Sequence, residues 1–154
     1  MPQEEKYGNR RLTYSAWHRS ASTRRFVGSQ TRALAMIDLD HILWIEYEDT
    51  TKWPLALIEE AEDVGQDQKP STVTENLATM ARLPALVVLW KPGSESNPAD
   101  PQWPDIEGFR VKRICPGPRM GWRIMTPEEY AQMLLRMRTY RVDKLDEALF
   151  GDVA

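Results

Sequence analysis

The chain of 154 residues has a single cysteine, Cys115, and only two histidines. One cysteine excludes a disulfide within the chain and a cysteine-based zinc site, and two histidines are too few for a histidine-rich metal site. No apolar run approaches the roughly 20 residues that a membrane-spanning helix needs. The first residues, MPQEEKYGNRR, lack the apolar stretch of a signal peptide, so we expect a cytoplasmic protein that does not bind a membrane.

Several motifs of catalytic and nucleotide-binding sites are also missing. The sequence contains no GxxxxGK[ST] phosphate loop, no GxGxxG dinucleotide fingerprint, no HExxH zinc motif and no GxSxG nucleophile elbow. What remains is chemistry based on carboxylates, or no chemistry.

Charge, by contrast, is abundant and unevenly distributed, although the net formal charge is only -3. Residues 1–32 hold seven basic and two acidic side chains, a net charge of +5, whereas residues 33–69 hold ten acidic and two basic ones, a net charge of -8. A metal-dependent nuclease uses basic side chains for phosphates and carboxylates for the ion. A solvated, self-compensating surface would show the same distribution, so charge alone does not decide.

Residues 34–61, LAMIDLDHILWIEYEDTTKWPLALIEEA, are the segment from which we predict the site. Side chains of a strand alternate between two faces, which places Asp38 and Asp40 together on one face of the first apolar stretch. Polar residues 50–52 favour a tight turn and an antiparallel hairpin, which would bring Asp38 or Asp40 near Glu59. Converging carboxylates suit hard divalent cations, so we expect Mg²⁺ or Mn²⁺ bound by Asp38, Asp40, Glu59 and Glu60.

Asp40 (or Asp38) followed by Ile58-Glu59-Glu60-Ala61 resembles the motif of the PD-(D/E)XK nuclease superfamily, which includes restriction endonucleases and Holliday-junction resolvases. The resemblance implies an αβββαβ core and a DNA substrate. It departs from the family at Ala61, where the family has a lysine. The missing group would then be supplied by Lys69 or Gln66 from the following segment, or by His18 acting as a base.

Four short stretches, YSAWHR, MIDLD, ALIE and DVGQ, are also similar to small proteins of actinobacterial phages. That resemblance implies a phage-encoded protein in the cytoplasm of a bacterial host. The basic side chains that we expect to contact DNA are Arg19, Arg24, Arg25, Arg110 and Lys112.

The remaining pattern predicts a single α/β (α+β) domain over residues 13–150, after a flexible N-terminus at 1–12. We expect a short strand or turn at Phe26 and Val27, a helix over 71–81 that buries Val73, Leu77 and Met80, and a buried strand over 85–90. A long proline-rich loop over 91–108, a strand over 109–114 and a short edge strand over 121–125 follow. A C-terminal helix begins at Thr126, and the predicted sheet is mixed and flanked by helices.

Three functions fit these observations. The first is a Mg²⁺- or Mn²⁺-dependent endonuclease or resolvase-like phosphodiesterase with Asp40, Glu59, Lys69 and His18 as catalytic residues. The second is an inactive module of the same fold that binds nucleic acid or a host protein, consistent with Ala61. The third is a phage structural or host-interaction protein. A second small apolar patch, over residues 145–150, would pack on the domain or bind a partner, so the sequence is also compatible with a homodimer.

Overall fold

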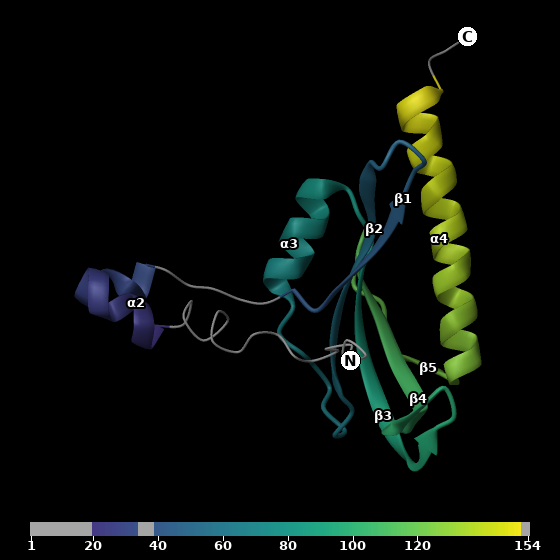
Figure 1. Cartoon of the computed structure of the whole chain (residues 1–154), viewed down its shortest axis with the longest axis horizontal. Coiled ribbons are helices and arrows are strands. Elements are labelled where there is room, and N and C mark those ends of the chain that lie inside the picture. The colour runs from purple at the N-terminus through teal and green to yellow at the C-terminus, as the bar shows by residue number, and fades with distance from the viewer. Residues whose placement is uncertain (1–19, 34–38, 152–154) are drawn as a thin grey trace, which may run out of the picture. The chain divides into compact units, whose positions relative to one another are not determined.

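The computed structural model describes residues 20–33 and 39–151, which belong to two compact units divided after Asp38 (Figure 1). In the first unit, α2 (Ser20–Val27) is followed by the 3-10 helix η1 (Gly28–Ala33). The alternative of a strand at Phe26 and Val27 is therefore wrong, because both residues end α2. Gly28, with φ +56°, ends that helix in the left-handed conformation that glycine adopts without steric cost.

The second unit contains a five-stranded mixed sheet, which confirms the predicted fold class. The strands lie in chain order: β1 (His41–Glu46), β2 (Lys52–Glu62), β3 (Ala85–Asn97), β4 (Asp100–Cys115) and β5 (Arg123–Met125). β2 and β3 are parallel and are joined by α3 (Thr72–Ala81), whereas the other neighbours are antiparallel. Figure 1 shows α3 on one side of the sheet and α4 (Pro127–Phe150) on the other.

The β1–β2 hairpin determines which carboxylates face each other. His41 pairs with Ile58 in the antiparallel register, and Leu43 pairs with Ala56 before the register shifts between Leu43 and Trp44. Asp40, the residue before β1, therefore comes opposite Glu59. The predicted antiparallel hairpin, with polar residues in its turn, is therefore confirmed.

Alternation along the strands gives the sheet two apolar faces. Between the sheet and α3 lies the buried cluster Leu57, Ala78, Leu83, Ala85, Val87, Ile114 and Cys115. The face toward α4 carries Ile58, Leu86, Val88, Val111 and Met125, against which Phe109, Tyr130, Met133, Leu134 and Met137 pack. β3 is covered on both faces, as its continuous apolar run predicts.

The predicted buried stripe of α3 is wrong, although the helix itself is confirmed. Val73, Leu77 and Met80 are 57%, 44% and 84% exposed, whereas Thr74 and Ala78 are buried. The small side chains of Thr74 and Ala78 allow α3 to lie close to the sheet. Thr74 also has a polar partner there, Glu59, whose Oε1 a larger apolar side chain would leave without a donor.

The predicted proline-rich loop at 91–108 is wrong as well. β3 and β4 continue as paired strands to a turn at residues 98–99, where the Asn97 side chain accepts a hydrogen bond from the Ala99 amide. The register shifts between Lys91 and Pro92 and again on both sides of Ser96. Prolines are tolerated at such irregularities because a ladder hydrogen bond is already missing there.

α4 begins as predicted at Thr126. The Thr126 side chain accepts from the Glu129 amide and the Glu129 side chain accepts from the Thr126 amide, which makes a capping box. The helix continues to Phe150, so the apolar patch predicted over 145–150 forms its last turns. No helix within residues 20–33 and 39–151 is long and apolar enough to cross a membrane.

Candidate active site

Asp40, Glu59 and Lys69 form one cluster on the α3 side of the sheet. Lys69 Nζ donates to Asp40 Oδ2 at 2.9 Å and to Glu59 Oε2 at 2.8 Å. The side chains of Lys69, Asp40 and Glu59 are 20%, 23% and 7% exposed, so the cluster is partly shielded from water. The predicted proximity of Asp40 and Glu59 is confirmed, and Lys69 is the cation that joins them.

Glu59 is held from two sides. It lies on β2, and its Oε1 accepts a hydrogen bond from the buried Thr74 hydroxyl of α3 while Oε2 accepts from Lys69. A buried carboxylate needs such donors because it has lost its water. Thr74 is a site residue that the sequence pattern did not identify, since its neighbours indicated only a helix start.

Asp40 is oriented by the backbone of the neighbouring strand. The Glu60 amide donates to Asp40 Oδ2 at 2.8 Å, beside the contact from Lys69. Burial alone would raise the pKa of Asp40, but the hydrogen bonds from the Glu60 amide and Lys69 outweigh it, and the pKa lies below its usual value. Asp40 is therefore a carboxylate at neutral pH.

Lys69 is a cation in this arrangement. Burial alone would lower the pKa of Lys69, but the hydrogen bonds that Lys69 donates to Glu59 and Asp40 outweigh that effect and raise it. The cluster consequently joins one ammonium group to two carboxyl groups.

Lys69 reaches the carboxylates because the segment after β2 folds back. Asp63 Oδ1 accepts from the Gly65 amide at 3.0 Å, and Gly65 has φ +84°, a conformation that favours glycine. The Gln66 side chain donates to the Glu62 carbonyl and accepts from the Val64 amide, both at 2.8 Å. Gln66, one of the predicted replacements for the missing lysine, therefore has a role in this turn.

Two side chains from later in the chain, those of Arg110 and Trp122, also hold the segment that follows β2 in place. Arg110 of β4 donates to both carboxylate oxygens of Asp63 at 2.7 Å and to the Gln66 carbonyl at 2.8 Å. Trp122 donates through Nε1 to the Asp67 carbonyl at 2.9 Å, and its ring lies 5.1 Å from the Arg110 guanidinium carbon. These contacts place Lys69, although none of them touches it.

Of the two β4 cations predicted to contact DNA, only Lys112 has its charge unpaired. Arg110 is engaged by Asp63, whereas among residues 39–151 no carboxylate pairs with Lys112, whose Nζ lies 5.4 Å from the centre of the Trp122 ring. Val87 pairs in register with Glu59 on one side and with Lys112 on the other. Lys112 is thus two strands, about 10 Å, from Glu59 along one row of the sheet.

The prediction that Glu60 shares a metal with Glu59 is wrong. Neighbouring residues of a strand point to opposite faces, and the Glu60 side chain lies on the α4 side, 3.9 Å from His41 Nε2. Glu60 acts on the cluster only through its backbone amide.

Five predicted site residues stay untested by geometry. His18, Arg19 and Asp38 lie outside the described residues. Arg24 and Arg25 are exposed in α2, which belongs to the first unit, and their contact with DNA remains a prediction.

The cluster can still accommodate the predicted cation, with fewer protein ligands than the sequence predicts. Within the described ranges, no three Asp, Glu, His or Cys side chains gather into a group that could hold a metal. Asp40 and Glu59 present carboxylate oxygens to one ammonium group on the same side of the sheet. Mg²⁺ is commonly held by one or two carboxylates together with waters and substrate phosphates, so a pair fits it.

The chain has no match among protein-family models, curated proteins or solved structures. The chemistry of the site is therefore inferred from its own residues. Two carboxylates beside an ammonium group can hold a hard cation, orient a water molecule and receive the negative charge of a phosphate.

Proposed function

We propose that the chain is a Mg²⁺- or Mn²⁺-dependent DNA nuclease of the PD-(D/E)XK type, with Asp40, Glu59 and Lys69 as its catalytic residues. The observation that carries the proposal is the contact of one ammonium group with both carboxylates. It supplies the three groups of the Asp…Glu-x-Lys motif although Ala61 occupies the position of the lysine. Lys69 reaches the same place from the segment that follows β2.

The order of elements supports this function. A hairpin, a crossover helix and a strand parallel to the second hairpin strand follow one another as β1, β2, α3 and β3. This is the order that the resemblance implies for the later part of the αβββαβ core. Asp40 directly before β1 and Glu59 on β2 then correspond to the motif positions.

Each residue of the cluster has a distinct role in the proposed reaction. Asp40 and Glu59 would hold the divalent ion, which when bound supplies a water of lowered pKa and neutralises charge on the phosphate. Lys69 would donate hydrogen bonds to a phosphate oxygen or to the attacking water, and so stabilise developing negative charge. Thr74 and the Glu60 amide keep the two carboxylates in place.

Lys112 would contact the DNA backbone next to the cluster. It lies in the same row of the sheet as Glu59 and has no carboxylate partner among the residues described in the second unit. A cation at this distance can bind a phosphate neighbouring the scissile one, because successive phosphates of a strand are several ångströms apart.

A cleavage assay with matched variants tests the proposal. Supercoiled plasmid and branched and single-stranded oligonucleotides are incubated with Mg²⁺, Mn²⁺ or EDTA. We expect cleavage by the wild type only with metal, and a loss of at least about 100-fold in Asp40→Asn and Glu59→Gln. Glu62→Gln, an exposed carboxylate on the same strand, is the control and keeps its activity. Cleavage that survives both substitutions would contradict the proposal.

A second candidate function is a non-catalytic module that binds DNA or a host protein. The favouring observation is that Lys69 pairs with both carboxylates, so the cluster is also satisfied as a structural ion triad. This function predicts no cleavage with either metal. DNA binding that weakens steeply with salt would then identify nucleic acid as the partner.

A further inference from the structure

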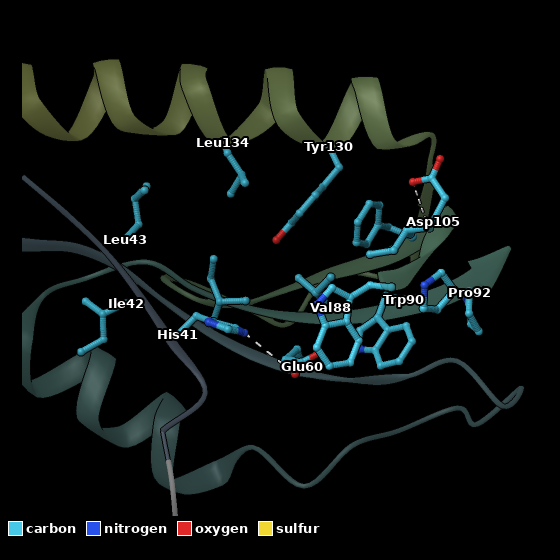
Figure 2. A pocket seen from close by; sticks show the side chains of 15 residues that line it. His41, Ile42, Leu43, Glu60, Val88, Trp90, Pro92, Asp105, Tyr130 and Leu134 are labelled. Atoms are coloured by element: carbon cyan, nitrogen blue, oxygen red, sulfur yellow. Dashed lines mark hydrogen bonds and ion pairs between the residues drawn. The ribbon is translucent and has the colours of Figure 1, made fainter. Parts of the chain in front are cut away.

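A cavity of about 630 Å³ lies on the other face of the sheet, beneath α4. Figure 2 shows Tyr130 and Leu134 pointing from α4 toward the sheet, and His41, Glu60, Val88 and Trp90 on the strands that face them. Alternation along β2 separates it from the catalytic cluster, because Glu60 points into it while Glu59 points to the α3 side. Its volume is in the range of small-molecule sites.

Aromatic rings from the strands and from α4 line the cavity, and together they are called the aromatic wall. Four of them line it: Trp90, Trp103, Phe109 and Tyr130. The rings of Phe109 and Tyr130 pack with centroids 4.2 Å apart, which gives this wall a fixed shape. Trp103, on the extended arm of β4, is 50% exposed and leaves ring surface available to a ligand.

The charged groups that line the cavity are all acidic. Glu60 and Asp105 contribute carboxylates, His41 adds an imidazole, and neither lysine nor arginine is among the described residues of the lining. Among the described residues, the basic side chain within 4 Å of the Glu60 carboxylate is that of His41, whose Nε2 lies 3.9 Å away, beyond hydrogen-bond length. Glu60 thus brings a negative charge to the aromatic wall, and no lysine or arginine pairs with it in the part of the chain that the structure describes.

The ionisation of Tyr130 agrees with this environment. Burial, and secondly the charge of Glu60, raise the pKa of Tyr130 to about 12. Both causes disfavour a further negative charge in the cavity, and the second, the charge of Glu60, would favour a positive one.

We propose that this cavity binds a small organic cation, an ammonium ion with apolar substituents, between the aromatic wall and the Glu60 carboxylate. Aromatic faces attract ammonium groups, and the attraction is strongest when the cation is removed from water. Phosphates and other anions are disfavoured by Glu60 and Asp105. A neutral apolar ligand would gain nothing from the carboxylates and would leave Glu60 partly desolvated. The site is independent of the proposed nuclease activity.

Titration with choline and with its neutral isostere 3,3-dimethylbutan-1-ol tests the proposal. The readouts are the indole N–H signals of Trp90 and Trp103 in NMR spectra of the full chain and the heat of binding. We expect choline to bind at least about 10-fold more tightly than the isostere, with saturation below about 50 mM. Equal affinity, or no binding of choline up to that concentration, would overturn the proposal.

Two variants and their controls locate the binding site. Glu60→Gln and Trp103→Leu should each weaken choline binding about 10-fold. Glu62→Gln on the same strand and Trp53→Leu, a partly exposed tryptophan outside the lining, should bind as the wild type does. Unchanged binding in Glu60→Gln would overturn the proposal. So would a dimer, detected by sedimentation, that excludes choline from the cavity, because a second copy would then be the occupant.

Discussion

Lys69 Nζ lies 2.8 Å from Glu59 Oε2, although ten residues separate the two in the chain. In the Glu-x-Lys pattern the lysine stands two residues after the glutamate and on the same face of the same strand. Here Ala61 has that position and the ammonium group returns from the segment beyond β2. A turn held by Asp63, Gly65 and Arg110 makes the return possible.

Thr74→Val should destabilise the protein, because it removes the hydroxyl that donates to the buried Glu59 carboxylate. An unsatisfied buried acceptor costs about 1–3 kcal/mol of unfolding free energy. Urea unfolding of Thr74→Val against Thr72→Val, an exposed threonine of the same helix, measures the effect. Equal stability of the two variants would show that the Thr74 contact contributes nothing.

The orientation of α3 leads to a second prediction. Ala78 is fully buried against the sheet, so Ala78→Leu should cost about 1–3 kcal/mol through overpacking. Met80→Ala, at a position 84% exposed, should change stability by no more than about 0.5 kcal/mol. Thermal or urea unfolding of the two variants measures these changes in the free energy of unfolding. The reverse order of the two effects would mean that α3 presents Met80 to the sheet instead.

The Asp63–Arg110 pair predicts a pH dependence of stability. The hydrogen bonds from Arg110, and then from the Gly65 amide, hold the pKa of Asp63 at about 2, below its usual 3.8. Because the folded pKa is the lower one, the stabilisation is present above pH 3.8 and is lost as the pH falls to about 2. Asp63→Asn should lower the urea midpoint near neutral pH and lose this effect near pH 2. Asp143→Asn, at an exposed position, is the control. The difference between its urea midpoint and that of the wild type should not change between neutral pH and pH 2.

Lys112→Ala should weaken DNA binding and reduce its salt dependence. One phosphate contact contributes about one unit to the slope of log affinity against log salt concentration. Binding to one chosen oligonucleotide at several salt concentrations measures that slope. Lys91→Ala, at a β3 lysine that pairs with Glu107, is the control. A slope unchanged in Lys112→Ala would remove Lys112 from the interface.

The hairpin and its two carboxylates could be predicted because their causes are local. Alternating side chains and a polar turn set the register, and the register places Asp40 opposite Glu59. The same alternation places Glu60 on the opposite face, so counting along β2 could have excluded it as a ligand. Lys69 was only one of three candidates, because no local pattern tells which long side chain returns to a strand.

The errors arose where tertiary contacts outweigh local preference. Helical spacing selected the apolar residues of α3, but the sheet accepts the small Ala78 and the hydrogen-bonding Thr74. Proline content indicated a loop over 91–108, but irregular pairing accommodates prolines within β3 and β4. Which residues of α3 are buried, and whether residues 91–108 form strands, both depend on the strand or helix that packs against them. The periodicity of a single segment carries no information about that partner.

Moving the lysine tests the proposed site most directly. Metal-dependent DNA cleavage is measured for the wild type, for Lys69→Ala and for the double variant Ala61→Lys/Lys69→Ala, which returns the lysine to the strand position of the motif. We expect Lys69→Ala to lose at least about 100-fold in rate and the double variant to regain part of that loss. Undiminished cleavage by Lys69→Ala would contradict the assignment of Asp40, Glu59 and Lys69 as one catalytic site.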